Sequence, residues 1–274
     1  MPAKPATILG SELHTLRSKD TGKPYRITIG LPFEYYDKPS KKWPVIYLVD
    51  GNWYFGMVTD MVRVMALCET TTDAIVVGIG YPNNKKKKRF HEDVFRRDFD
   101  LTPIANEKFE KEDGDFINRK VNTGGVNKFI NLIQHELMPF VNKKYRVSPG
   151  KRVLVGHSFG GLFAAYALLE KPRLFTHYLV CSPSLWWHDQ YMFDREKDFA
   201  KRHRQLKANV YLSAGDLEEN ANSGMASNTL RFSAILQSRS YKGLNIVQEI
   251  FNAKKHCEVV APSYQAGLKW ALKK

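Results

Sequence analysis

The sequence has few cysteines and no long apolar run. Its three cysteines, Cys68, Cys181 and Cys257, are scattered along 274 residues, which is too few for a disulfide framework. No stretch approaches the roughly 20 consecutive apolar residues that a membrane-spanning helix needs. The first ten residues, MPAKPATILG, also lack the apolar segment of a secretory signal peptide. We therefore expect a cytoplasmic protein with no membrane span.

Motifs for nucleotide and metal binding are also missing. The chain has no GxxxxGK[ST], no GxGxxG after a predicted strand, no HExxH and no paired Cys-x-x-Cys, so we expect no cofactor and no metal. No nucleic-acid-binding module is recognisable either, although the formal net charge is +14. The basic residues gather in loops such as the run 85–89 and at the C-terminus. We interpret them first as a solvated face and second as a means of attracting an acidic substrate.

One stretch, KRVLVGHSFGGLFAAYALLE at 151–170, carries a catalytic signature. Residues 153–155 are typical of a buried strand and residues 162–169 of an apolar helix. Between them lies a G-x-S-x-G motif centred on Ser158. This context predicts a nucleophile elbow, a strained turn in which side chains at 156 and 160 would collide with neighbouring backbone. The alternative is an ordinary serine in a glycine-rich turn.

Strand and helix patterns alternate along the chain and predict its fold class. Two antiparallel strands are expected first, at 11–17 and 23–31, with a turn between them. Buried strands and helices then alternate to the end of the chain, which predicts one α/β domain over 1–274 with a mostly parallel sheet covered on both faces. The segment 80–124 is long, polar and weakly periodic. A charged helical stretch makes 186–206 a candidate cap.

The base and the orienting acid should follow the nucleophile in the order Ser, acid, His. Among eight histidines, His256 follows the last predicted strand and precedes the last helix, where the base belongs; His188 is the reserve. The other interpretation of His256 is a loop histidine in a basic stretch. Three carboxylates follow the predicted strand 210–213: Asp216, Glu218 and Glu219. Glu218 is the first choice and Asp216 the reserve, although either could cap a helix or be solvated.

Two backbone amides should form the oxyanion hole. One is the amide of Phe159, the residue after the nucleophile. The second should follow the predicted strand 45–49, at Gly51 or Asn52, because the turn there can point an amide inward. Almost any residue type can supply a backbone amide, so this prediction depends only on the positions of these residues in the chain.

Six segments together resemble the esterases of the α/β-hydrolase superfamily that are grouped with esterase D. Within that group they resemble the siderophore trilactone esterases of the ferric-enterobactin and bacillibactin type. The segments are TGKPYRITIGLP, WPVIYLVDG, RRDFDLTP, GGVNKFINLIQHELMPFVNKKYRVSP, GHSFGGLFAAYAL and SPSLWW. They span most of the chain, from about 11 to 256. Their combination is specific for the family but for no particular substrate.

The resemblance implies an α/β-hydrolase fold and a serine hydrolase of carboxylic esters. Ser158 and His256 carry over directly, and the match to the family's oxyanion loop favours the Asn52 amide. In the family the acid varies, and some members are described as working with little more than a Ser–His pair. The resemblance therefore leaves the role of Glu218 open.

The resemblance also points to residues on the substrate side. Arg97 and Asp100 match the family's R-x-x-D-L-T-P segment, and a positive group near the mouth of the site would suit an anionic catecholate complex. Trp186 and Trp187 match an aromatic pair, which could contact the substrate or pack under the cap.

We expect a serine esterase that forms an acyl-enzyme on Ser158 with a small-molecule ester. A siderophore lactone, free or in its anionic ferric form, is the first hypothesis for the substrate, and a general acyl ester or thioester is the second. A non-catalytic binding protein with this fold is less favoured. A scaffold would need neither the elbow, nor the acid loop, nor the terminal histidine.

Overall fold

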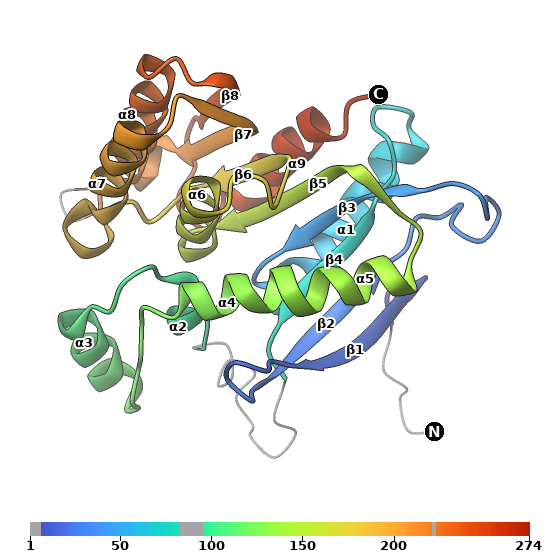
Figure 1. The fold of residues 1–274 in the computed structure, drawn as a ribbon, viewed down its shortest axis with the longest axis horizontal. Helices are drawn as coiled ribbons and strands as arrows, with labels where there is room; N and C mark the ends of the chain where they lie inside the picture. Colours follow the sequence, from blue (N-terminus) through green and yellow to red (C-terminus); the bar gives the residue numbers. More distant parts are fainter. Residues whose placement is uncertain (1–6, 83–95, 221–222) are drawn as a thin grey trace.

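A single mixed sheet forms the centre of the molecule (Figure 1). The computed structural model describes residues 7–82, 96–220 and 223–274, and within them eight strands pair in the order β1-β2-β4-β3-β5-β6-β7-β8. The strands are β1 (Ser11–Arg17), β2 (Pro24–Gly30), β3 (Trp43–Leu48), β4 (Ile75–Gly80), β5 (Val147–His157), β6 (His177–Cys181), β7 (Gln205–Gly215) and β8 (Lys242–Phe251).

The sheet is antiparallel at one edge and parallel elsewhere. β1 pairs antiparallel with β2, with Leu13 opposite Thr28, and β2 pairs antiparallel with β4. All neighbours from β4 to β8 are parallel. Both predictions, the N-terminal antiparallel pair and the mostly parallel sheet, are confirmed.

Helices cover both faces of the sheet. They are α1 (Gly51–Leu67), α2 (Arg96–Leu101), α3 (Glu107–Ile117), α4 (Val126–Leu132), α5 (Met138–Lys144), α6 (Phe159–Glu170), α7 (Trp187–Arg202), α8 (Met225–Ser238) and α9 (Val260–Ala271), with a π-helical turn (Ile133–Leu137) joining α4 to α5. Within the described part of the chain, no helix is both long enough and apolar enough to cross a bilayer.

Two buried clusters form the core, one on each face. α1 and α9 pack in the cluster on one face, and α4 to α8 contribute to the larger cluster on the other. Along β3, Val45 and Tyr47 belong to the larger cluster, whereas Ile46 and Leu48 belong to the smaller one. This period of two is typical of a strand that is buried on both faces.

The described part of the polar segment between β4 and α4 contains two helices. α3 begins after Asn106, whose side chain accepts a hydrogen bond from the amide of Phe109 at 3.1 Å. Among the residues of α3, only Gly114 is fully buried, which explains the weak apolar periodicity of its sequence. The basic run 85–89 lies outside the described residues.

The candidate cap segment, 186–206, contains α7 in the connection between β6 and β7. Met192, Phe193 and Phe199 of α7 are buried in the larger core cluster. Most of the segment therefore belongs to the helical layer on the sheet. Only Trp186, at its start, lines the pocket described below.

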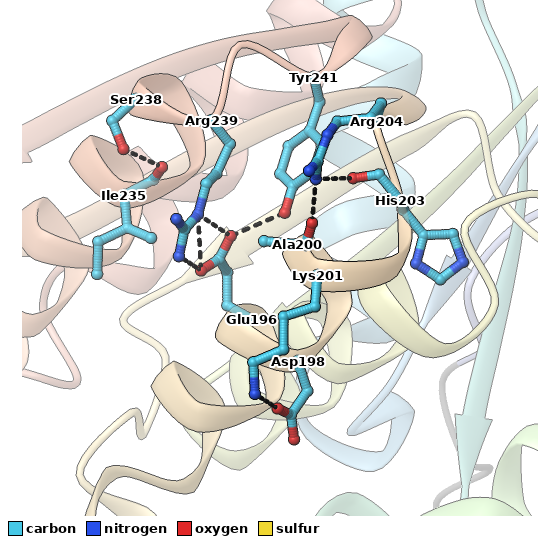
Figure 2. Close-up of polar contacts among 10 residues, drawn as sticks. All are labelled: Glu196, Asp198, Ala200, Lys201, His203, Arg204, Ile235, Ser238, Arg239 and Tyr241. Atoms are coloured by element: carbon cyan, nitrogen blue, oxygen red, sulfur yellow. Dashed lines mark hydrogen bonds and ion pairs between the residues drawn. The ribbon is translucent and has the colours of Figure 1, made fainter.

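An ion pair between a buried carboxylate and a partly exposed arginine fixes α7 against the end of α8 (Figure 2). The Glu196 side chain is 1% exposed, and its carboxylate accepts hydrogen bonds from Nε and Nη2 of Arg239 and from the Tyr241 hydroxyl at 2.9 Å. Next to this cluster, Arg204 donates to the backbone oxygen of Ala200. These contacts hold the C-terminal half of α7 in one place.

The C-terminal ends of the parallel strands lie at the same edge of the sheet. Asp50 follows β3, Ser158 follows β5, Glu218 follows β7 and His256 follows β8. β3 lies between β4 and β5, so the strand order reverses there. In open α/β sheets, ligands bind outside the carboxyl ends of the strands at such a reversal.

Candidate active site

Ser158 forms the sharp turn between β5 and α6. β5 ends at His157 and α6 begins at Phe159, and Ser158 has φ 62° and ψ −122°. A non-glycine residue with positive φ is strained, and such strain gathers at functional sites. The predicted strand–turn–helix arrangement around Ser158 is confirmed.

Two glycines allow this turn to close. A Cβ at Gly156 would lie 2.0 Å from the backbone oxygen of Gly160, so no side chain fits there. At Gly160 the Cβ would meet the side chain of Val49 at 2.7 Å. The predicted collision with backbone is therefore correct at 156 but wrong at 160, where the obstacle is a side chain.

Glu218 provides the carboxylate that faces His256. Its Oε2 lies 2.6 Å from Nδ1 of His256. Its Oε1 accepts hydrogen bonds from the Ser182 hydroxyl at 2.7 Å and from the amide of Gly215 at 2.6 Å. The Glu218 side chain is 1% exposed and that of His256 is 41% exposed. With Nδ1 directed at the carboxylate, Nε2 is the ring nitrogen that can exchange a proton with a substrate.

Asp216, the reserve acid, binds the backbone of the histidine loop. Its Oδ1 accepts a hydrogen bond from the amide of Lys254 at 3.2 Å. Backbone hydrogen bonds, first of all that from Ala253, hold the pKa of the Asp216 carboxyl below its usual value. A Cβ at Gly215 would lie 2.2 Å from the Lys254 oxygen, so the end of β7 and this loop approach as closely as a glycine permits. Asp216 thus places the loop, and Glu218 contacts the ring.

Ser158, Glu218 and His256 line one pocket of about 400 Å³. The pocket walls also include three large apolar side chains and one cation, which are Trp186, Leu217, Met225 and Lys255. A serine hydroxyl, an imidazole with an oriented carboxylate and an apolar cavity are the groups that serine-dependent acyl transfer requires.

The two predicted oxyanion amides lie at helix N-termini. Asn52 is the second residue of α1 and Phe159 is the first residue of α6. Amides in the first turn of a helix point away from it and favour negative charge. The Asn52 side chain makes two hydrogen bonds to Tyr81, with Nδ2 donating to its oxygen at 2.8 Å and Oδ1 accepting from its amide at 2.6 Å. These bonds fix the start of α1 to the end of β4.

Arg97 forms a bidentate ion pair with Asp50. Its Nε and Nη2 donate to the two carboxylate oxygens at 2.7 and 2.9 Å. The guanidinium lies against the rings of Trp53 and Phe159, at 5.4 and 5.3 Å from their centroids. Although burial disfavours its charge, the Asp50 carboxylate raises the pKa of Arg97. Arg97 therefore supports the turn before α1, where Asp50 has a left-handed conformation (φ 55°).

The two predicted tryptophans have different environments. Trp186 lines the pocket, with its ring centroid 6.1 Å from that of Phe159. Trp187 is 1% exposed and its indole donates to the backbone oxygen of Ile104 at 3.1 Å. Its ring packs edge-on against Phe159 at 5.1 Å. Trp186 can thus touch a ligand in the pocket, whereas Trp187 packs behind the pocket wall.

The remaining candidates lie apart from the pocket. Asp100 is buried and accepts a hydrogen bond from Tyr25 at 2.9 Å; burial raises its pKa to about 6. His188, the reserve base, stands at a kink in α7 with φ 46° and does not line the pocket. In the described residues, no group of three or more His, Cys, Asp or Glu side chains is arranged to hold a metal ion.

Comparisons with known proteins identify the family. The family model described as "Putative esterase" matches residues 18–258. This chain belongs to that family. It is 29% identical over 272 residues to ferri-bacillibactin esterase BesA of Bacillus subtilis, which covers 97% of this chain and 91% of BesA. It is 34% identical over 206 residues to the siderophore enterobactin esterase of Emericella nidulans, with coverages of 72% and 65%.

Solved structures support the fold of this esterase. The crystal structure of the BES protein from Bacillus cereus superimposes with a TM-score of 0.83 at 28% identity and covers all of both chains. The siderophore hydrolase EstA from Aspergillus nidulans has a TM-score of 0.82 at 27% identity, over 98% of this chain and 96% of EstA. The predicted α/β-hydrolase fold is confirmed. The chain is a serine esterase, a hydrolase of carboxylic esters that acts on a small-molecule ester.

Two residues near the site have no predicted role in the sequence. Ser182 donates a hydrogen bond to Glu218, and His157 packs against His256. A signal for Ser182 was present, because it opens the SPSLWW motif directly after β6. His157 gives no comparable signal, since it ends an apolar strand and its ring could have pointed elsewhere.

Proposed function

We propose that Ser158, His256 and Glu218 are the catalytic triad of this esterase. The observation that carries the proposal is the 2.6 Å contact between Glu218 Oε2 and His256 Nδ1, at a pocket that also contains Ser158. The strained conformation of Ser158 adds support, because it presents the hydroxyl at the start of α6.

The reaction proceeds in two halves through an acyl-enzyme. Ser158 Oγ attacks the ester carbonyl carbon while His256 Nε2 accepts the hydroxyl proton, and Glu218 stabilises the imidazolium. The tetrahedral oxyanion is bound by the amides of Phe159 and Asn52, each worth about 10²–10³-fold in rate. Its collapse expels the alcohol, which takes the proton from His256. A water then attacks the acyl-enzyme, again with His256 as base, and releases the carboxylic acid and free Ser158.

A siderophore lactone is the substrate that the relatives favour. BesA is named a ferri-bacillibactin esterase, and the Emericella nidulans relative is named a siderophore enterobactin esterase. The pocket fits aromatic arms of an anionic substrate, because Trp186, Leu217 and Met225 give an apolar surface and Lys255 adds a positive charge. The net charge of +14 would attract such a substrate from a distance.

The predicted substrate residues divide into two groups within this proposal. Trp186 contacts the substrate from the pocket wall. Arg97 and Trp187 act from behind it, Arg97 by fixing Asp50 and Trp187 by supporting Phe159. The positive charge at the mouth comes instead from Lys255.

Labelling with a fluorophosphonate tests the enzymatic proposal. We expect the parent protein to take up one label per chain and Ser158→Ala to take up none. Ser148→Ala is the matched control, because Ser148 lies near the start of the same strand. An unlabelled parent would contradict the proposal and favour a non-catalytic binding protein. A labelled Ser158→Ala would contradict the assignment of Ser158, because another residue would then be the reactive nucleophile.

Substrate competition tests the proposed class. A ferric tricatecholate trilactone and p-nitrophenyl butyrate are compared by kcat/KM at two salt concentrations. We expect the lactone to be hydrolysed at least 100-fold faster, with a preference that decreases at high salt. Rapid hydrolysis of the simple ester and none of the lactone would support a general acyl esterase instead.

A further inference from the structure

His157, the residue before the nucleophile, lies directly against His256. The two ring centroids are 4.4 Å apart and the rings are inclined by 37°. His157 is 3% exposed. The ring of His256 lines the pocket, packs against the buried His157 and contacts Glu218 at Nδ1.

Burial keeps the His157 ring neutral. Burial, followed by the charges of His256 and Arg97, holds the pKa of His157 well below its usual value. Within the described part of the chain, Nδ1 is buried without a hydrogen-bond partner. A neutral imidazole, in which one ring nitrogen carries no proton, is consistent with this buried nitrogen.

An aromatic wall supports His157 from the other side. The ring of Tyr54 lies edge-on to it at 6.4 Å, and Tyr264 lies edge-on to Tyr54 at 5.5 Å. Tyr264 is fully buried. His157 therefore has little freedom to move, and the contact with His256 is backed by rigid packing from α1 and α9.

We propose that His157 is a positioning residue that holds the imidazole of His256 against Glu218. It acts through His256 and does not touch the substrate. The inference depends on the proposed triad. The His256 side chain is 41% exposed, and Glu218 holds it at one ring nitrogen. A contact at one nitrogen does not fix the plane of the ring, so a second support is needed. A displacement of about 1 Å in a catalytic group can cost roughly 10²-fold in rate.

The neutral state of His157 suits this position. During acyl transfer His256 becomes an imidazolium, and a second cation 4.4 Å away would oppose that step. The charged groups that influence His157 are His256 itself and Arg97, and Arg97 is already paired with Asp50. A buried histidine that stays neutral can therefore support the ring without repelling it.

Three substitutions separate the role of the ring from that of its nitrogens. His157→Phe keeps a ring beside His256 but removes the nitrogens, His157→Gln keeps a polar group but removes the ring, and His157→Ala removes both. The matched control is His177→Phe. His177 is a partly buried histidine whose pKa is likewise lowered, to about 4, but it stands at the start of β6 and packs on Trp270.

The measurements are kcat, KM, the pH profile of kcat/KM and thermal stability. The number of active sites used to calculate kcat is determined by fluorophosphonate labelling. We expect His157→Ala to lower kcat at least 10-fold with KM within about threefold of the parent. We expect the Phe and Gln variants to lower kcat as well, but by less than His157→Ala. The acidic limb of the profile should move to lower pH, because the imidazolium is held less well by Glu218. His177→Phe should leave kcat and the profile unchanged.

The proposal is overturned if folded Phe and Gln variants both keep the parent's kcat per labelled site within twofold and its pH profile. This conclusion stands even if His157→Ala does not fold. Failure of the parent to react with the fluorophosphonate would instead contradict the catalytic assignment of Ser158, so the two failures are distinguishable.

Discussion

Glu218 directs one carboxylate oxygen to Nδ1 of His256, at 2.6 Å, and uses the other for Ser182 and Gly215. Every hydrogen bond of this buried carboxylate therefore helps to fix its direction. Asp216, two residues earlier, binds the amide of Lys254 instead. The geometry thus distinguishes an acid that orients the imidazole from one that places its loop.

Glu218→Gln should reduce kcat by about 10³–10⁴-fold, because an amide opposite Nδ1 favours the wrong tautomer of His256. Asp216→Asn should reduce kcat less than 10-fold, since its partner is backbone. Steady-state kinetics of both variants with one ester measure the difference. Equal, small losses in the two variants would favour a Ser–His pair without an essential acid.

The strained turn at Ser158, the proposed nucleophile, could be predicted from sequence because its signal is local. The turn at Ser158 needs only a strand, a glycine two residues before it and a helix after it, and all three lie within twenty residues. His256 was also predictable, because parallel strands bring their ends to one edge in a known chain order. The structure places both residues in one pocket.

The sequence ranked Glu218 before Asp216 but could not show which of them faces His256, because both lie on the same short turn after β7. Which of them faces His256 depends on the 3₁₀ turn (Asp216–Glu218) and on Ser182, which comes from a different strand. The pairing of Arg97 with Asp50 could not be predicted from sequence either, because 47 residues separate them. Side-chain direction across such distances is set by packing and leaves no local pattern.

Ser182→Ala should lower kcat about 10-fold with little change in KM, because Glu218 loses one of the donors that set its direction. Loss of a hydrogen bond to a charged group should also reduce the free energy of unfolding by about 1.5–3 kcal/mol. Ser213→Ala is the control, since the Ser213 hydroxyl contacts Ser263 at 3.1 Å instead of the triad. Unchanged kcat in Ser182→Ala would show that Gly215 alone is sufficient to orient the acid.

Arg97→Met should destabilise the protein by about 3–5 kcal/mol, because it leaves the Asp50 carboxylate buried without its partner. It should also lower kcat, since the turn before α1 carries the proposed Asn52 amide. The double variant Asp50→Asn/Arg97→Met should recover part of the stability, because it also removes the unpaired carboxylate. Asn tolerates the left-handed conformation at position 50. Urea denaturation of the parent and the single and double variants measures the coupling. Additive losses in the double variant would contradict this account.

Glu196→Ala should change stability but not catalysis. It leaves Arg239 and Tyr241 without the Glu196 carboxylate. Because the Arg239 side chain is 38% exposed, we expect a cost of about 1.5–3 kcal/mol. The cluster joins α7 to α8 (Figure 2), and none of its residues lines the pocket, so kcat of the folded variant should stay within twofold of the parent. Denaturation and kinetics on the same preparation test both parts. A large loss of kcat in folded protein would instead show that α7 acts as a cap on the site.

Asp98→Asn should reveal a pH-dependent cost of burying a carboxyl. Burial raises the pKa of Asp98 to about 7, with smaller contributions from Asp113 and Asp50, against an ordinary value of 3.8. The folded state therefore binds the proton more tightly than the unfolded state. The stability from this group is fully present below pH of about 4 and is lost as pH rises toward 7.

The stability that Asp98→Asn gains over the parent should accordingly grow from pH 4 to pH 8, by up to about 4 kcal/mol. Urea denaturation of the parent and the variant at pH 4, 6 and 8 measures that gain, with Asp113→Asn as the neighbouring control. Asp113 is more exposed, so its substitution should show a weaker dependence. A gain that is the same at all three pH values would mean that Asp98 titrates alike in the folded and unfolded states. A gain that decreases with pH would mean that Arg97 stabilises the charged carboxylate more than burial opposes it.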